Sequence, residues 1–340
     1  MNTYLYHLEF PVGAHFGRQG IGLEETGETV PSDSLVSGIV NAFALMGEAE
    51  EVLHELGGAS PPFVLSSLFP FGPGADNGEK PLYAVPRPLS SPPVKDPRLL
   101  QRAGKDLKKT RYLQPRDVLR WLDGKPLSAK DLEAIQERTR GLARPWDGES
   151  QDGWSATTLR PRVALDRASQ GSTIWWCGVV HFRRGAGLYG LVRFRDDTWR
   201  ARLETALRLL GDMGLGGERT YGLGTFRFGG FLPLKDVWGE LGRPQEVGRF
   251  VLLSRYVPAV TELARLRETL TAWDMEESRG FVVSGRHALT LKRKRVRCLT
   301  EGSVATEPLA GRLVDVTPEH GPALGLPHRV YRSGLGFWFP

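Results

Sequence analysis

A glycine-rich loop between a helix and a strand is the feature that most restricts how this chain folds. Residues 198–213 follow two aspartates, Asp196 and Asp197, that suit an N-cap, and their apolar side chains recur at helical spacing, which predicts one amphipathic helix. Residues 214–224, GLGGERTYGLG, contain five glycines, and the TFRFGGF that follows alternates like a strand. The loop therefore leaves the C-terminus of a helix and enters a strand.

This direction argues against a nucleotide-binding loop. Phosphate-binding loops open a helix, so that free backbone N–H groups at its N-terminus point at the phosphate. A helix C-terminus repels anions instead. Glycine backbone can still lie close to a sugar-phosphate chain because it has no side chain to hold the two apart. We therefore expect an RNA-binding surface here, with Arg219 as phosphate contact and Tyr221 as stacking face, and a ligand-free turn as the alternative.

The neighbouring segments predict an α+β fold. Residues 3–10 alternate like a half-buried strand, for which core packing is favoured over base stacking. A helix then begins near residue 32, capped by Ser32 or Asp33, and ends at Gly47. Residues 172–184 and 188–195 are expected to pair as a hairpin across a tight turn. With the helix and strand described above, the order is βαββαβ, that of a ferredoxin-like unit.

The length of 340 residues suggests two domains. We expect a first ferredoxin-like domain over 1–235, a linker over 236–248 and a second ferredoxin-like domain over 249–340, with a helix at 259–270. The first domain carries an insertion over about 61–155. Ten prolines between residues 61 and 97 predict short extended pieces there, and a helix is expected over 128–140.

Positive charge is concentrated in separate stretches. The formal net charge is +6, and residues 279–300 contain seven Lys or Arg and no acid. Residues 98–125 and 160–202 each contain nine Lys or Arg against three Asp. Such stretches suit an extended polyanion that crosses several elements, and solvated surface is the alternative.

Other classes of protein are disfavoured by composition. No run of about 18 apolar residues occurs, and the N-terminus lacks the pattern of a signal peptide, so a soluble, cytoplasmic protein is expected. Cys177 and Cys298 stand far apart without further ligands at metal spacing. We expect neither a metal nor a cofactor.

Four collinear segments, together with the glycine-rich loop, resemble a known family. The loop itself is similar to the signature of the RAMP superfamily of CRISPR RNA-binding proteins. PSDSLVSGIVNAF, DLKKTRYLQPRDVLRWLDG, RPRVALDR and LKRKRVRCLTEGSV resemble, in order, segments of the Csm-type RAMP subunit of type III-A effector complexes. Pro31 departs from this pattern, since a polar residue or His is more usual before Ser32.

The resemblance implies a non-catalytic subunit that holds the repeat-derived 5′ tag of the crRNA. It also implies two protein partners, the large polymerase-like signature subunit and the backbone RAMP subunits, with target RNA met indirectly. The residues expected to bind RNA are Gly216, Gly217, Arg219, Thr220, Tyr221, Gly222, Gly224, His15, Arg18, Ser32, Lys108, Lys109, Arg111, Arg160, Arg162, Arg167, Lys292, Arg293, Lys294 and Arg295.

Two catalytic alternatives remain open at this point. Some RAMP relatives cleave precursor crRNA without metal, and His15 is the candidate general acid or base, with Arg18 or Lys108 to stabilise charge. Asp33 resembles the loop aspartate that backbone subunits use in metal-dependent cleavage, although an Asp at a helix start is first of all a cap. Asp166 is expected to pair with Arg162 or Arg167 and shape its loop.

Overall fold

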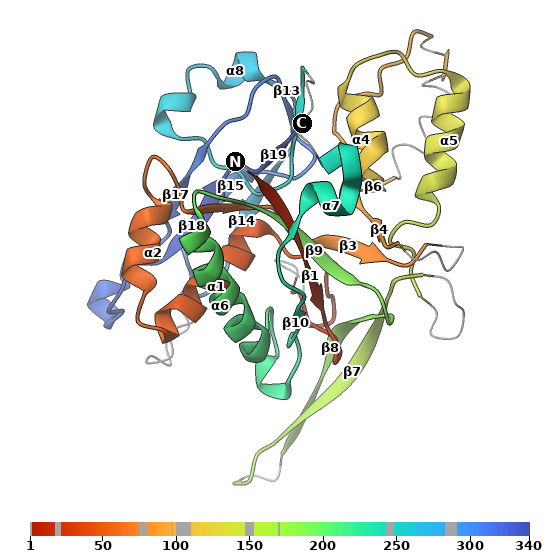
Figure 1. Ribbon diagram of the computed structural model, residues 1–340. Coiled ribbons are helices and arrows are strands. Elements are labelled where there is room, and N and C mark those ends of the chain that lie inside the picture. The colour runs from red at the N-terminus through yellow and green to blue at the C-terminus, as the bar shows by residue number, and fades with distance from the viewer. Residues whose placement is uncertain are drawn as a thin grey trace.

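The computed structural model describes residues 2–17, 22–74, 80–96, 98–99, 110–146, 153–168, 171–242, 248–282 and 291–340. Its largest sheet is antiparallel and has the order β10-β1-β9-β3-β4, with β2 also on β9 and β11 also on β1 (Figure 1). The first and last strands of the expected βαββαβ order thus lie side by side. The strands are β1 (Thr3–Glu9), β2 (Phe63–Leu65), β3 (Phe69–Gly72), β4 (Leu82–Tyr83), β9 (Gly187–Phe194), β10 (Arg227–Phe228) and β11 (Leu232–Pro233).

Helices α1 (Ser32–Leu45) and α6 (Asp197–Met213) cover one face of this sheet, and α2 (Ala49–Leu56) packs beside α1. The prediction for α6 is confirmed: the Asp196 carboxylate accepts from the Trp199 amide at 3.1 Å, and the expected apolar stripe is buried. The cap predicted for α1 is wrong. Its N-cap residue is Pro31, and the next two side chains are already inside the helix and buried.

The opposite face of the sheet is also covered, because the insertion and the C-terminal part of the chain pack on it. Leu5 of β1 lies in that second core, while Tyr6 and Leu8 point to the helix side. The expected half-buried strand is therefore a central strand with apolar packing on both faces. The elements on the second face include α4 (Pro115–Leu122), α5 (Ala129–Thr139), α7 (Leu234–Trp238) and the short pair β5 (Val85–Pro86) and β6 (Tyr112–Leu113).

The helix expected over 128–140 is confirmed as α5, with a capping box in which Ser128 and Asp131 bond each other's backbone amides. The extended pieces expected over 61–97 are also present. Two of them, β2 and β3, belong to the main sheet, where both pair with β9 and take the place of the second strand of the βαββαβ order. Both lie inside the range that the sequence analysis assigned to the insertion.

The predicted pairing of residues 172–184 with 188–195 is wrong. β8 (Ser172–Phe182) pairs along its whole length with β7 (Ser155–Leu165), and the two form a long ribbon that extends from the body (Figure 1). β9 is buried along almost all of its length and pairs instead with β1, β2 and β3. The outer half of β8 is exposed, so it suits a projecting ribbon rather than the sheet.

The C-terminal part is built mainly from short strands. The helix expected over 259–270 is broken into η3 (Val260–Glu262) and α8 (Leu266–Thr269). The buried Glu262 carboxylate turns the chain there, because it accepts from the Tyr256 hydroxyl at 2.8 Å and from the Ala310 amide at 2.7 Å. The strands are β12 (Phe250–Leu252), β13 (Leu270–Ala272), β14 (Met275–Ser278), β15 (Val296–Leu299), β16 (Val304–Ala305), β17 (Gly311–Asp315), β18 (Tyr331–Leu335) and β19 (Trp338–Phe339).

The described residues of 249–340 therefore do not contain the two helices that a second βαββαβ unit needs. Their sheet has the order β13-β16-β12-β19, with β14-β15 and β17-β18 as separate pairs. What holds for the whole chain is a mixed helix and strand fold. The division at 236–248 stays a prediction.

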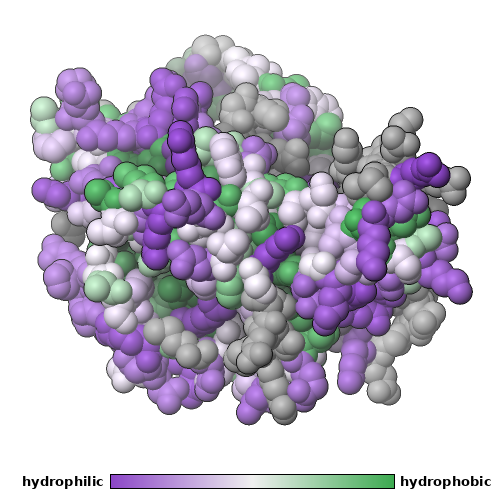
Figure 2. Space-filling model, turned by 90° about the horizontal axis from the view of Figure 1, so that it is seen from above, coloured by the Kyte–Doolittle hydropathy of each residue, from purple (hydrophilic) through white to green (hydrophobic). Residues whose placement is uncertain are grey.

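The outer surface is largely polar at the end of the molecule away from the ribbon. Seen from above, this face is mostly hydrophilic, with small hydrophobic areas between the charged side chains (Figure 2). Among the described residues, no helix combines the length and the apolar character needed to cross a membrane.

Candidate nucleic-acid interface

The glycine-rich loop is a tight structure with one short crest. Arg219, Thr220 and Tyr221 form a 3₁₀ turn, η1, at the end of the segment that leaves α6. Thr220 is exposed, and the Tyr221 side chain has 56% of its surface open to solvent. The residues on both sides of the crest have positive φ angles, at Gly214, Gly216, Glu218, Gly222 and Gly224. The loop thus presents its polar and aromatic side chains outward.

The glycines hold this loop against the segment that follows β1. The Gly217 amide donates to the His15 carbonyl and the Gly224 amide donates to the Gly13 carbonyl, both at 2.9 Å. A Cβ atom on Gly216 would lie 2.4 Å from the His15 carbonyl oxygen, and one on Gly224 would lie 2.1 Å from that of Leu215. These glycines are therefore required by close backbone packing within the protein.

His15 lies beneath the loop and is only 3% exposed. Its Nδ1 donates to the Gly178 carbonyl at 2.8 Å, which ties the loop to the base of β8. Its other ring edge faces Gly217, where an added Cβ would lie 2.8 Å from the ring. The geometry gives His15 a structural role under the interface and places it away from any ligand surface, in contrast to the catalytic alternative.

The ribbon contributes an arginine to the same site. The guanidinium of Arg162, on β7, stacks over the Tyr221 ring with its carbon 4.3 Å from the ring centre. Its Nε is buried and has no hydrogen-bond partner among the described residues. Beneath this pair, Cys177, Val179 and Leu223 pack together. Two elements far apart in the sequence thus meet in one cationic and aromatic surface.

The two faces of the ribbon differ in chemistry. Side chains alternate along each strand, and directly paired residues share a face. Arg160 and Arg162 therefore lie on the face turned to the loop, where Arg160 also bonds the His181 ring at 3.2 Å. The other face is apolar and exposed along both strands, and it consists of Leu159, Pro161, Val163, Leu165, Ile174 and Trp176.

The tip of the ribbon carries Arg167, which is exposed. The Asp166 carboxylate accepts from the Ala168 amide at 2.9 Å, and the Asp166 amide donates to the Gly171 carbonyl. Asp166 therefore shapes the turn through the backbone, and its pairing with Arg162 or Arg167 stays a prediction.

Ser32 and Asp33 are placed quite differently, because both are 2% exposed. The Ser32 amide donates to the Ser67 hydroxyl and the Ser32 hydroxyl accepts from the Arg255 amide, both at 2.8 Å. Asp33 forms a buried ion pair with Arg332 and accepts from the Ser278 hydroxyl at 2.9 Å. The structure therefore makes these residues a polar junction between α1 and the C-terminal strands, and not an RNA surface or a metal-binding carboxylate.

The second basic segment, residues 292–295, is separate from the loop and lies by the β14–β15 pair (Figure 1). Lys292 and Lys294 are exposed. Arg293 is more enclosed: its Nε donates to the Phe281 carbonyl at 2.9 Å, and burial lowers the pKa of its guanidinium, with nearby Arg332 acting in the same direction. Arg295 lies 3.7 Å from the Glu277 carboxylate.

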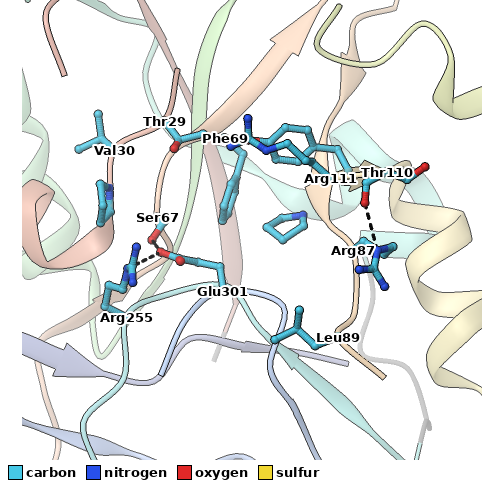
Figure 3. Close-up of a pocket in the computed structure, with 13 residues that line it drawn as sticks. Thr29, Val30, Ser67, Phe69, Arg87, Leu89, Thr110, Arg111, Arg255 and Glu301 are labelled. Carbon is cyan, nitrogen blue, oxygen red and sulfur yellow. Dashed lines mark hydrogen bonds and ion pairs between the residues drawn. The ribbon is translucent and has the colours of Figure 1, made fainter. Parts of the chain in front are cut away.

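The remaining candidates divide in two. Arg111 is exposed and lines a hollow of about 340 Å³ between the insertion and the C-terminal part (Figure 3). Arg18, Lys108 and Lys109 lie outside the described residues. The structure thus brings together the loop, the ribbon arginines and the segment around His15, and places residues 292–295 and Arg111 elsewhere.

Sequence reasoning missed the apolar face of the ribbon and the contact between Arg162 and Tyr221. A signal was present: in LRPRVAL the arginines stand two residues apart with apolar residues between them, which is the pattern of a strand with one basic and one apolar face. It could not be used without knowing which strand pairs with it.

The described groups offer little catalytic chemistry. No cluster of three or more metal-ligating side chains occurs in the described part of the chain. Burial raises the pKa of the Cys177 thiol, and it raises that of the Cys298 thiol to about 12, so neither supplies a thiolate near neutral pH. What the site does offer is backbone, cations and an aromatic ring, which are the groups that hold single-stranded RNA.

Comparison with known proteins finds relatives among the CRISPR Csm4 proteins. Residues 245–340 match the family of the CRISPR Csm4 C-terminal domain. A Csm4 protein of Thermococcus onnurineus is 28% identical over 320 residues, covering 90% of this chain and 89% of that protein. A Csm4 protein of Mycobacterium tuberculosis is 27% identical over 334 residues, covering 97% of this chain and 95% of that protein.

Solved structures share the fold. A crystal structure of a Csm3–Csm4 subcomplex of the type III-A interference complex contains a chain that matches with a TM-score of 0.59 at 17% identity, covering 99% of both chains. A Csm1–Csm4 cassette with bound pppApA matches with a TM-score of 0.56 at 20% identity, covering 99% of this chain and 97% of the other. The resemblance predicted from the loop and the four collinear segments is confirmed.

Proposed function

We propose that this chain, a relative of the Csm4 proteins over nearly its whole length, is the subunit of a type III-A Csm complex that holds the 5′ tag of the crRNA. It acts there without catalysing a reaction. The tag lies across the crest of the glycine-rich loop, with Arg219 on a phosphate, a base against the Tyr221 ring, and Arg162 and Arg160 following the backbone from the ribbon.

The observation that carries this proposal is the stack of Arg162 on Tyr221. A guanidinium over an exposed ring is already arranged as a platform for a base. The loop beneath is held by backbone bonds, so the platform is preorganised and little conformational freedom is lost on binding.

Two protein partners complete the proposal, a Csm1-like large subunit and Csm3-like backbone subunits. The apolar face of the ribbon is suited to a protein neighbour, because a contiguous exposed row of large apolar side chains is unfavourable in water until it is covered. We assign this face to the adjacent backbone subunit. Such a complex assembles in the cytoplasm, where crRNA is made.

The same proposal includes the domain organisation predicted from sequence. A ferredoxin-like domain over 1–235, with its insertion, carries the loop and the ribbon. A second domain over 249–340 is built mainly from strands. The linker over 236–248 joins them.

Fluorescence anisotropy with labelled RNA tests the RNA-binding role. The protein, alone or in its complex, is expected to bind RNA with the repeat-derived 5′ tag more tightly than RNA with a scrambled tag at physiological salt. Arg162→Ala weakens this binding. Arg140→Ala is the matched control, since Arg140 is an exposed arginine at the end of α5, away from the ribbon.

Equal affinity for tagged and scrambled RNA contradicts the proposal, as does an equal effect of the two arginine variants. The ribbon assignment is tested separately by co-purification. Val163→Asp together with Ile174→Asp places two charges on the apolar face and is expected to release the backbone subunits while tag binding is retained. Unchanged co-purification removes the ribbon from that interface.

A further inference from the structure

The hollow that Arg111 lines has a chemistry that the loop site does not explain. It lies between the segment before α1, the β5–β6 pair and the C-terminal part, and its volume is about 340 Å³. Its polar wall includes Arg87, Arg111, Arg255 and Glu301, and Phe69 and Leu89 add apolar surface (Figure 3). One carboxylate thus shares the hollow with three arginines.

The carboxylate is held firmly and still has an oxygen to offer. Glu301 Oε1 accepts from the Ser67 hydroxyl and lies 3.3 Å from Arg255 Nε. Oε2 has no hydrogen-bond partner among the described residues. The Glu301 side chain is 15% exposed, so it is sheltered but not fully enclosed. A donor N–H that enters the hollow finds a fixed acceptor at this end.

The opposite side of the hollow is positive (Figure 3). Arg87 is fixed by donating from Nε to the Thr110 carbonyl and from Nη1 to the Pro88 carbonyl, both at 3.0 Å. Arg111 is exposed and lies over the Tyr112 ring, and it has no carboxylate partner in the described part of the chain. An anionic group is therefore favoured at the end opposite Glu301.

A ligand that matches both ends carries a donor at one end, a flat apolar body and an anion at the other. We infer that the hollow receives one nucleotide of single-stranded RNA whose base has an exocyclic amino group, with that group donating to Glu301 Oε2 and the phosphate held by Arg111. Cytosine presents such an amino group at N4, to which a carboxylate is the natural partner. Uracil presents a carbonyl oxygen at this place, which repels the carboxylate.

The segment between β1 and α1 contacts both the hollow and the glycine-rich loop. Thr29 lines the hollow, and two residues earlier the Gly27 amide donates to the Phe16 carbonyl at 2.7 Å. Phe16 follows His15, whose carbonyl bonds the glycine-rich loop. One continuous piece of protein thus links the two sites. The inference rests on the proposed RNA-binding function and adds a selected base to it.

The test compares two labelled RNAs of about ten nucleotides, all cytidine and all uridine, by anisotropy at physiological salt. They differ in the groups at N3 and C4, so stacking and charge are nearly matched. The wild-type protein is expected to bind the cytidine RNA about 5- to 100-fold more tightly. Glu301→Gln is expected to bring this ratio close to one, because an amide can accept from cytosine or donate to uracil.

Arg111→Ala is the companion variant, and it should weaken both RNAs equally and leave the ratio unchanged. Leu89→Trp covers the case in which Glu301→Gln does not fold, since it fills the hollow while the carboxylate corner stays intact. It should also abolish the preference for cytidine.

Equal binding of the two RNAs by the wild-type protein, or a preference that survives both Glu301→Gln and Leu89→Trp, overturns the inference. The proposed function is tested by a separate measurement, the binding of tagged and scrambled RNA. If tagged RNA still binds better than scrambled RNA and binding still depends on Arg162, only the base-selecting hollow fails. If the protein binds neither tagged nor scrambled RNA, both proposals fail.

Discussion

The glycine-rich loop and the first turn of α1 differ in the exposure and hydrogen bonding of their polar side chains. Sequence reasoning predicted RNA contact at both. At the loop, Tyr221 is exposed and Arg162 retains an unused donor. At α1, Ser32 and Asp33 are buried and fully engaged with groups of the protein. The difference teaches that a polar motif indicates a ligand surface only where its hydrogen-bonding groups are not already paired within the protein.

The strongest test of this contrast is Asp33→Ala. It leaves the Arg332 guanidinium buried without its ion-pair partner, and we expect the free energy of unfolding to fall by about 3 to 5 kcal/mol. Urea denaturation measures this. Asp197→Ala removes an exposed first-turn acid of α6 and should change stability by no more than about 0.5 kcal/mol. A stable Asp33→Ala protein that has lost RNA affinity would reverse the roles assigned to the two regions.

A pair of glycine substitutions tests the loop itself. Gly222 and Gly224 both have a φ of +79°, but a Cβ meets nothing within 4 Å at Gly222, whereas at Gly224 it meets the Leu215 carbonyl. Gly222→Ala should cost about 1 to 2 kcal/mol of stability from the left-handed backbone alone. Gly224→Ala should cost about 2 to 4 kcal/mol and also weaken RNA binding. Equal costs in thermal or urea unfolding would show that close packing does not shape the loop.

Tyr221 separates binding from stability. Because its ring is exposed, Tyr221→Ala should leave unfolding nearly unchanged and weaken binding of tagged RNA by about 1 to 3 kcal/mol through lost stacking. Tyr221→Phe retains the ring and should retain most of the affinity. An alanine variant that binds like the wild type would remove the ring from the interface.

The smallest expected effect is on salt dependence. For Arg219→Ala, the log-log slope of affinity against salt should fall by about 0.7, the contribution of one phosphate contact to a single strand. Lys294→Ala asks whether the RNA also reaches the separate basic segment, and the same reduction is expected there. A slope that does not move places that side chain off the RNA path.

Local chemistry explains which parts of the fold could be predicted. The helix α6 was readable because its Asp cap and its apolar stripe lie within 18 residues of one another in sequence and act locally. The strand that pairs with β8 could not be predicted from the sequence. Two apolar strands around a tight turn favour a hairpin unless one of them pairs with other strands. β9 pairs with three other strands, β1, β2 and β3, and these pairings join residues far apart in the sequence.

The candidate site follows the same rule. The half-buried Arg219 and the exposed Tyr221 could be named because a glycine-rich loop is expected at the surface. The fate of Ser32 could not, since its partners Ser67 and Arg255 are 35 and 223 residues away. The helix expected over 259–270 failed for a similar reason: the Glu262 carboxylate bonds the Ala310 amide, 48 residues further along the chain.

The core shared between the sheet and the last strands has a consequence for how the protein is made. Arg193 of β9 donates to the Trp338 carbonyl at 2.8 Å and stacks on the Phe337 ring, and Phe339 lies in the same core as Leu5. A growing chain that has reached only the glycine-rich loop already holds every strand of its main sheet up to β9 and the insertion that covers part of one face, yet the rest of that face is still open. The ribosome must synthesise the chain as far as Phe339 before that face can close, so chaperones have a long interval in which to bind.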